Sequence, residues 1–183
     1  MPVISDINRA VEALREAVEQ ARRICLFTGA GISTESGIPD FRSPGGIWSR
    51  MRPITYQEFV ASEAARLEDW KRRFAMMEQF AAAEPNAGHR AITALVRSGR
   101  SPAVITQNID GLHQRTGTPE DCIIELHGTA AYATCLDCCQ RYELETCRRM
   151  IEETRAAPRC TACGGLVKAA VISFGQAMPE EAM

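Results

Sequence analysis

The sequence predicts an α/β fold built on an open, mostly parallel β-sheet, with a small cysteine-bearing insert toward its end. Three short apolar runs, at residues 24–27, 103–106 and 122–126, alternate with segments of helical pattern, as parallel strands joined by helices do. Two Cys-x-x-Cys pairs interrupt this alternation between residues 135 and 163. A chain of 183 residues is long enough for one domain that carries such a module.

The first element expected is a helix. Apolar residues fall at helical spacing from Ser5, which we take as the N-cap, to Ala21, and this predicts a surface helix with one buried stripe. The apolar run 24–27 follows as the first strand and leads directly into a glycine-bearing loop. The next segment, 43–46, has the composition of a mobile loop that can act as a lid.

The middle of the chain is predicted to be mainly helical. One helical region runs from about Tyr56 to Ala83 with an interruption near Ser62, and a shorter helix covers His89 to Arg97. Strands are expected at 103–106 and 122–126, and a fourth candidate at 170–174 follows the cysteine insert. Because the carboxyl ends of parallel strands share one edge of a sheet, the polar residues after the first three strands are expected to form one composite site.

The loop after the first strand indicates a nucleotide ligand. Gly29 and Gly31 let the backbone turn tightly and bring its N–H groups close to a phosphate. The third glycine of the usual dinucleotide fingerprint is missing at its usual spacing, so an ordinary tight turn is the alternative. The continuation favours a ligand-binding loop, because it places polar, charged and aromatic side chains together: Ser33, Ser36, Pro39, Asp40, Phe41 and Arg42.

Polar groups also follow the second and third strand candidates. Gln107, Asn108 and Asp110 supply two amides and a carboxylate, which suit a carboxamide and ribose hydroxyls, although a polar loop with an Asp-Gly turn is the alternative. His127 stands between an apolar run and a glycine, where it can exchange protons near neutral pH or serve as a structural histidine. His89 and His113 are interpreted as scaffold or loop residues.

The cysteine pairs predict one structural zinc ion. Cys135 with Cys138, and Cys160 with Cys163, have zinc-ribbon spacing, and four thiolates complete a tetrahedron that leaves no open position. Free thiols or a disulfide are the alternative. Cys139 lies beside Cys138 and could substitute for it as a ligand.

Charge and composition exclude several partners. The 21 basic and 23 acidic side chains give a net charge of −2, so charge alone attracts neither nucleic acid nor an anionic membrane. We see no segment of membrane-spanning length and no secretory signal. Eight cysteines without an export signal are expected to be thiols or metal ligands in a reducing cytoplasm.

Taken together, these motifs resemble the sirtuins, the NAD-dependent protein deacylases. The loop 29–42, the segment 106–113 and the string Glu125-Leu126-His127-Gly128 occur in the family's order, and the resemblance covers about residues 20 to 180. It implies one sirtuin-type domain over 1–183. Within it, 1–130 and 166–183 form an incomplete Rossmann-like NAD-binding part and 131–165 a zinc-ribbon-like module.

The resemblance also implies residue roles. Gln107 and Asn108 contact the ribose, Ile109 and Asp110 hold the nicotinamide carboxamide, and His127 is the general base, with Asn108 as a second catalytic residue. Phe41 shields the reactive carbon. The full NAD-binding set is Gly29, Ala30, Gly31, Ser33, Ile38, Asp40, Phe41, Arg42, Trp48, Gln107, Asn108, Ile109 and Asp110.

The reaction implied by the resemblance is deacylation of a modified lysine in a protein or peptide. The acyl oxygen attacks the nicotinamide-bearing ribose carbon of NAD and expels nicotinamide. His127 then assists the attack of a ribose hydroxyl, and water completes the transfer, which gives free lysine and O-acyl-ADP-ribose. Val171, Phe174 and Gly175 bind the substrate in a strand from 171 to 175 that pairs with the peptide backbone. Protein mono-ADP-ribosylation at the same site, or a non-catalytic zinc-stabilised binding module, are the alternatives.

The chain departs from the family pattern at several positions. Gln176 replaces an acidic residue, and Ala169-Ala170 replaces a Pro-Asp pair. Arg73 stands three residues after Trp70, where it could pair with an acidic acyl group, while a solvated helix face is the alternative. The resemblance further implies that the chain is a C-terminally truncated sirtuin, whose activity and stability are reduced because an apolar sheet edge is exposed.

Overall fold

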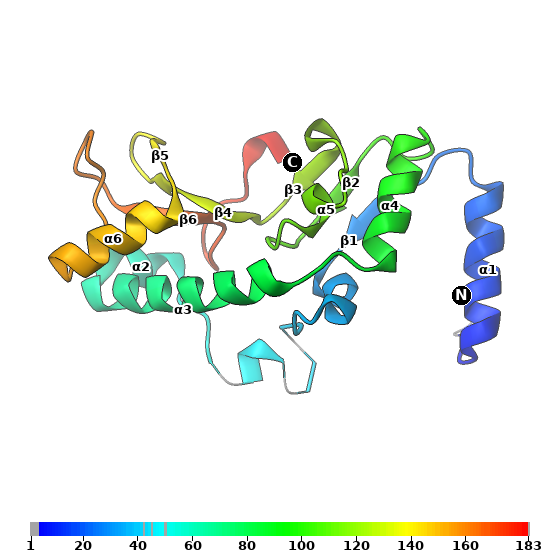
Figure 1. The fold of residues 1–183 in the computed structure, drawn as a ribbon, viewed down its shortest axis with the longest axis horizontal. Helices are drawn as coiled ribbons and strands as arrows, with labels where there is room; N and C mark the ends of the chain where they lie inside the picture. The colour runs from blue at the N-terminus through cyan, green and yellow to red at the C-terminus, as the bar shows by residue number, and fades with distance from the viewer. Residues whose placement is uncertain (1–3, 42, 45, 50, 183) are drawn as a thin grey trace.

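The computed structural model describes residues 4–41, 43–44, 46–49 and 51–182. Two small three-stranded sheets lie along the length of the molecule, and helices accompany both (Figure 1). One sheet is parallel and the other antiparallel. This α/β architecture with an open parallel sheet agrees with the fold class predicted from the sequence.

The parallel sheet carries the strands that the apolar runs predicted. Its order is β1-β2-β3, with bounds Leu26–Thr28, Val104–Thr106 and Ile123–Glu125. The last residues of these strands, Thr28, Thr106 and Glu125, lie side by side in register. The three strands therefore end at one edge, and the loops that follow them begin next to one another.

Helices flank the parallel sheet. They are α4 (Ala87–Arg97) and α5 (Leu112–Arg115), with the 3₁₀ helices η1 (Ala30–Ser36) and η3 (Glu120–Cys122), while α1 (Ile7–Gln20) precedes β1 in the chain. Asn86 caps α4 by accepting hydrogen bonds from the N–H groups of Gly88 and His89, at 2.9 and 3.3 Å. The predicted start at His89 is thus three residues after the observed cap. Among the described residues, no helix is both long and apolar enough to cross a membrane.

Helix α1 differs from its prediction in two respects. Its N-cap is Asp6 rather than Ser5, because the Asp6 carboxylate accepts the Arg9 N–H at 2.8 Å. Its apolar stripe is not buried, since Ile7, Val11 and Leu14 are 73%, 60% and 65% exposed. The helix stands at one end of the molecule, away from the sheets (Figure 1). Helical periodicity defines an apolar face, but nothing in the described chain covers this one.

The second sheet is antiparallel and has the order β5-β4-β6. Its strands are β4 (Gly128–Cys135), β5 (Arg141–Tyr142) and β6 (Val167–Val171). The predicted fourth strand at 170–174 is therefore wrong in its bounds and in its place, because β6 ends at Val171 and pairs with β4. Only two residues separate β3 from β4, which is too short for the crossover that a parallel strand requires.

The main core lies between the antiparallel sheet and helices α3 (Glu63–Ala82) and α6 (Leu144–Thr154), and α2 (Tyr56–Ala61) directly precedes α3. Trp70 of α3 is completely buried and stacks on Phe74, with ring centroids 5.4 Å apart. The same cluster includes Cys135 and Cys160. The core is thus continuous from α3 to two of the four cysteines of the predicted zinc site.

Two further 3₁₀ helices are η2 (Ile47–Ser49) and η4 (Glu180–Ala182).

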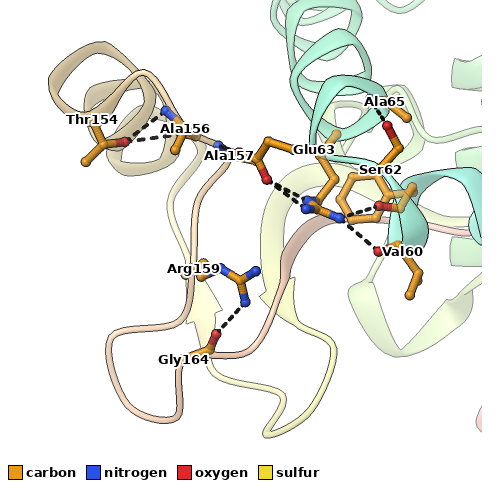
Figure 2. Close-up of polar contacts among 11 residues, drawn as sticks. Val60, Ser62, Glu63, Ala65, Thr154, Ala156, Ala157, Arg159 and Gly164 are labelled. Carbon is orange, nitrogen blue, oxygen red and sulfur yellow. Dashed lines mark hydrogen bonds and ion pairs between the residues drawn. The ribbon is translucent and has the colours of Figure 1, made fainter.

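Ser62 separates α2 from α3, as predicted. It ends α2 and caps α3, where its hydroxyl accepts the Ala65 N–H at 3.2 Å. Arg66 reaches back to the carbonyls of Phe59 and Val60 at 3.0 and 2.9 Å. Figure 2 shows the Glu63 carboxylate between this guanidinium and the backbone N–H of Ala157. Glu63 therefore ties the start of α3 to the segment that follows α6.

We expect Glu63→Ala to reduce the free energy of unfolding by about 1 kcal/mol at pH 7, because an inter-segment hydrogen bond and an ion pair are lost. The hydrogen bond from the Ala157 N–H lowers the pKa of Glu63 most, and the hydrogen bond from Arg66 lowers it less. A lowered carboxyl pKa adds stability above its unfolded value and loses it as pH falls, so the difference from wild type should shrink in acid. Urea unfolding at pH 7 and pH 3 measures this.

Glu68→Ala is the matched control. Glu68 is similarly exposed and pairs with Arg72 at 2.7 Å within the same helix. An exposed pair four residues apart contributes only about 0.3–0.5 kcal/mol. Equal losses in the two variants would show that the Glu63 contact with Ala157 contributes nothing.

Candidate functional site

The loops that follow β1 and β2 are locked together at the carboxyl edge of the parallel sheet. The Gln107 N–H donates to the Thr28 carbonyl at 3.0 Å, and the Leu126 N–H donates to the Thr106 carbonyl at 2.9 Å. The hydroxyls of Thr28 and Thr106 are bonded at 2.8 Å. These contacts hold the three loop starts side by side, as the sequence predicted.

The loop after β1 enters the short helix η1 through Gly29. This glycine has extended backbone angles and forms the N-cap of η1, and Gly37 ends the helix with φ 84°. A Cβ on Gly31 would meet no atom within 4 Å, so the space beside this turn is open. The N–H groups at the start of a helix lack partners within it and attract anions. The arrangement thus leaves a ligand room to approach the first turn, which includes Ala30.

Ser33 connects this loop to the segment after β2. Its hydroxyl donates to Asp110 Oδ2 at 2.7 Å and accepts from Asn108 Nδ2 at 3.3 Å. The same amide donates to the Gly29 carbonyl at 3.1 Å, and the Leu112 N–H donates to Asp110 Oδ1 at 3.0 Å. Ser33 is buried, whereas Asn108 and Asp110 are half-buried. Ser33 therefore fixes the amide and the carboxylate, both of which belong to residues that stay partly exposed.

His127 joins the same edge from the turn between β3 and β4. Its Nδ1 lies 3.0 Å from the Gln107 carbonyl oxygen. A carbonyl can only accept, so Nδ1 carries the hydrogen and Nε2 of the neutral ring holds a free lone pair. The His127 carbonyl accepts the Ile172 N–H at 2.9 Å, which fixes the backbone beneath the ring. The half-buried side chain is therefore oriented to accept a proton at Nε2.

The other predicted NAD-binding residues are less closely connected to this group. Ile38 is buried against Ala83 and Leu112, where it supports the loop. Asp40 accepts the N–H and the hydroxyl of Ser43, at 2.8 and 2.6 Å, and so closes the turn that follows. The backbone of Ile109 accepts the Ala130 N–H at 3.1 Å. Phe41 is half-buried, and Arg42 and the side chain of Trp48 lie outside the described residues.

The predicted substrate-binding residues do not form one strand. Val171 ends β6, and Phe174 and Gly175 form a turn, with φ 80° at the glycine. The carbonyl of Phe174 accepts the Tyr56 N–H at 2.9 Å, and that of Gly175 accepts the Gln57 side chain at 3.2 Å. The expectation of a strand through Gly175 is wrong because the start of α2 takes these carbonyls.

Four sulfur atoms come together at the far end of the antiparallel sheet. Those of Cys135, Cys138, Cys160 and Cys163 all lie within 4.8 Å of one another, and the shortest separations are 3.5 Å. A Zn–S bond of about 2.3 Å gives tetrahedral S···S distances of about 3.8 Å, and a disulfide bond is only about 2.05 Å long. The four thiols thus fit a zinc site and do not fit disulfides. Cys139 is exposed and does not belong to the cluster.

Tyr142 favours the thiolate form at one of the four cysteines, Cys160. The Tyr142 hydroxyl donates to Cys160 Sγ at 3.1 Å, and this bond is the main cause that lowers the pKa of the Cys160 thiol to about 6. A Cβ on Gly165 would lie 2.9 Å from Cys135 Sγ and 2.2 Å from the Asp137 carboxylate. Only glycine allows so close an approach, so the loop after the second pair is fitted to the cluster.

Several residues of the site were not found from the sequence. Asn86 donates from its side chain to the Ile32 carbonyl and to the Ser36 hydroxyl, at 2.6 and 3.0 Å, and holds η1 against α4. The N-cap pattern of an asparagine before a helix was the available signal. Thr28 and Thr106 were not predicted as site residues either, because a threonine at the end of a strand has no distinctive sequence pattern.

Arg73 is neither solvated nor available as a free charge. Its Nε lies 3.4 Å from Asp69 Oδ2, and the two side chains are 16% and 9% exposed. The sequence had offered a solvated helix face or a contact with an acidic acyl group. The structure instead pairs the guanidinium within α3.

Comparisons with known proteins agree on one family. A profile of the Sir2 family matches residues 29–183. NAD-dependent protein deacetylase 1 of Bradyrhizobium diazoefficiens is 56% identical over 99% of this chain and 71% of its own length. The NAD-dependent protein deacetylase of Rhodopseudomonas palustris is 53% identical over 99% and 72%.

Solved structures support the same conclusion. A Sir2 enzyme solved to explain mechanism and regulation has a TM-score of 0.77 at 37% identity, covering 96% of this chain and 69% of its own. A complex of Sir2 with a p53 peptide and NAD⁺ has a TM-score of 0.75 at 33% identity, covering 94% and 68%. The chain matches about 70% of the length of these relatives, and it belongs to the Sir2 family.

Proposed function

We propose that this chain is an NAD-dependent protein-lysine deacetylase. The observation that carries the proposal is the junction of Ser33, Asn108 and Asp110 beside a histidine whose Nε2 is free to accept a proton. The deacetylase names of relatives at 56% and 53% identity support the same activity. Bound NAD would supply the ribose carbon that the acyl oxygen attacks, nicotinamide as the leaving group, and the ribose hydroxyl that accepts the acyl group.

In the proposed site the chain binds NAD through three kinds of group. Backbone N–H groups at Gly29, Ala30 and Gly31 face the phosphates, because the start of η1 favours an anion. Amide groups of Gln107 and Asn108 contact the ribose hydroxyls. Each Asp110 oxygen already accepts one hydrogen bond and has capacity for another, from the carboxamide of nicotinamide.

His127 is proposed as the general base. Its Nε2 accepts a proton from a ribose hydroxyl, and Nδ1–H keeps its bond to the Gln107 carbonyl throughout. That carbonyl also stabilises the imidazolium that results, as a fixed dipole does for developing charge. A general base contributes about 10²–10⁴-fold to such a step.

The chain is also proposed to bind zinc and an acyl-lysine peptide, and to act in the cytoplasm. Cys135, Cys138, Cys160 and Cys163 hold one structural zinc ion, which has no open coordination position for catalysis. The acyl-lysine peptide is placed beside Val171, Phe174 and Gly175. Thiolate ligands persist in a reducing compartment, which supports the cytoplasm.

The test is a reaction with NAD and an acetyl-lysine peptide, followed by mass spectrometry. Nicotinamide and deacetylated peptide should form in equal amounts, with O-acetyl-ADP-ribose as the third product. Labelled NAD that leaves ADP-ribose on protein would instead assign mono-ADP-ribosyl transfer. Zinc binding without any release of nicotinamide would assign a non-catalytic module. A panel of acyl groups then defines the acyl preference.

We expect Ser33→Ala to raise the KM for NAD about tenfold, because Asn108 and Asp110 lose the hydroxyl that joins them. The control is Thr34→Ala in the same helix, since the exposed Thr34 hydroxyl bonds only locally, to the Gly31 carbonyl at 2.9 Å. Its KM should stay within about twofold of wild type. Initial rates over a range of NAD concentrations measure both, and equal KM values would remove Ser33 from the site.

A further inference from the structure

Two histidines that the proposed reaction does not use lie buried behind the candidate site. His89 of α4 and His113 of α5 are 0% and 2% exposed. Their ring centroids are 5.1 Å apart and the rings are tilted by 60°. Polar rings so deeply buried must be explained by their hydrogen bonds, because an unsatisfied buried group is costly.

The hydrogen bonds of Thr28 define the tautomer of His113. Thr28 has one hydroxyl hydrogen and donates it to Thr106 Oγ1 at 2.8 Å. The Thr28 oxygen lies 3.0 Å from His113 Nε2 and can therefore only accept there. His113 thus carries its hydrogen on Nε2, and in the neutral ring Nδ1 is an acceptor.

The backbone of Asn86 defines the tautomer of His89. The Asn86 N–H donates to His89 Nδ1 at 3.3 Å, so this nitrogen holds a lone pair and the hydrogen is on Nε2. Within the described part of the chain, His89 Nε2 and His113 Nδ1 are both buried and both without a hydrogen-bond partner. One is a donor and the other an acceptor. The two tilted rings therefore present one donor nitrogen and one acceptor nitrogen only while both rings are neutral.

We propose that His89 and His113 are a neutral pair of positioning residues that sets the geometry of the NAD pocket. The proposal rests on the proposed function and deepens it. His89 acts through Asn86, whose side chain holds η1 at the Ile32 carbonyl and the Ser36 hydroxyl. The ring itself touches neither substrate nor cofactor.

His113 acts on the other side of the pocket. It fixes the Thr28 hydroxyl, which donates to Thr106, and the same Thr106 oxygen accepts the Asn108 N–H at 3.0 Å. Asn108 then bonds the Gly29 carbonyl and Ser33. The pair thus connects the β1 loop with the loop after β2, the two segments that bind NAD in the proposal.

The electrostatic surroundings are consistent with two neutral rings. Burial lowers the pKa of both histidines. For His113, burial and the neighbouring His89 together lower the pKa to about 4. Asp110 opposes the shift at both rings, and Arg90 adds to it at His89. A lowered histidine pKa does not reduce the free energy of unfolding at pH values above 6.5, the pKa of histidine in the unfolded chain. Stability should fall between pH 6.5 and about 4, where only the unfolded chain binds the protons.

Two substitutions at His113 distinguish its hydrogen bond to Thr28 from its contribution to the packing of the core. The amide of His113→Gln reaches the place of Nε2 and can donate to Thr28, whereas the shorter His113→Asn reaches only the place of Nδ1. We expect His113→Asn to raise the KM for NAD about tenfold, His113→Gln to leave it within about twofold, and kcat to change little in either. Urea unfolding of both variants accompanies the kinetics. Equal KM values for the two variants would overturn the proposal.

A second measurement does not depend on turnover. Nitrogen NMR of the ¹⁵N-labelled chain at pH 6 should show both rings neutral, with the hydrogen on Nε2 in each. A charged ring, or an Nδ1–H tautomer in either residue, would refute the pair. If the chain releases no nicotinamide, the proposed function fails, while the NMR result still decides whether this pair exists.

Discussion

Replacing His127 with alanine is expected to reduce kcat/KM for deacetylation by about 10²–10⁴-fold, because the proposed general base is removed. The ring is held by one bond from Nδ1 to the Gln107 carbonyl, at 3.0 Å, and this leaves Nε2 as the acceptor. Steady-state rates with an acetyl-lysine peptide and NAD measure the effect. Affinity for NAD, measured by calorimetry, should change little, because the Ser33, Asn108 and Asp110 contacts do not involve His127.

His127→Asn is the matched variant. The asparagine amide can occupy the place of Nδ1 and keep the bond to the Gln107 carbonyl, but it has no group at the place of Nε2. It should therefore be as inactive as the alanine variant while its thermal stability stays near wild type. Wild-type turnover in either variant would refute the assignment of His127 as base.

Removal of zinc is expected to unfold the antiparallel sheet and the core beneath it. The cluster of buried residues that contains Cys135 and Cys160 also contains Trp70, Tyr142 and Val167. Zinc binding to four thiolates contributes about 10–16 kcal/mol at pH 7, which is as large as the whole stability of a typical domain, about 5–15 kcal/mol. A strong chelator should therefore abolish the tertiary signal of Trp70, which is completely buried in the folded chain. Tryptophan fluorescence and near-UV circular dichroism monitor the loss.

Two cysteine substitutions identify the ligands. Cys160→Ala should lose the metal and unfold, because it removes one of the four sulfurs of the cluster. Cys139→Ser should keep one zinc ion per chain and normal stability, because Cys139 is exposed and outside the cluster. Atomic absorption gives the zinc content. Retention of zinc in the alanine variant, or its loss in the serine variant, would contradict the assigned ligand set.

The parallel sheet could be predicted because its strands are short and apolar. Each strand is continuous with a polar motif, and parallel pairing places those motifs at one edge whatever the details of packing. The observed register of Thr28, Thr106 and Glu125 meets this expectation. The cysteine spacing likewise predicted the cluster, because two close pairs need only one loop to bring them together.

Other features depended on contacts between distant segments. The apolar face of α1 follows from periodicity, yet whether anything covers it depends on the rest of the molecule, and Leu14 is 65% exposed here. The orientation of β6 depended on β4, which starts too soon after β3 to continue the parallel sheet. The pair of Arg73 with Asp69 is different, because the two residues lie four positions apart on α3 and this spacing in the sequence already allowed the pairing.

Sequence patterns were sufficient to predict the α/β class, the order of the motifs, the four sulfurs and the convergence of Gly29, Asn108 and His127. All of these depend on local patterns and on the direction of parallel strands. Tertiary structure alone decided which hydrogen-bond partner each polar group has. It placed Gln107 against His127, joined Ser33 to Asp110, and buried His89 against His113. Such pairings join residues from 20 to 77 positions apart, and no local pattern records them, because a hydrogen bond requires only that the fold bring two groups within about 3 Å.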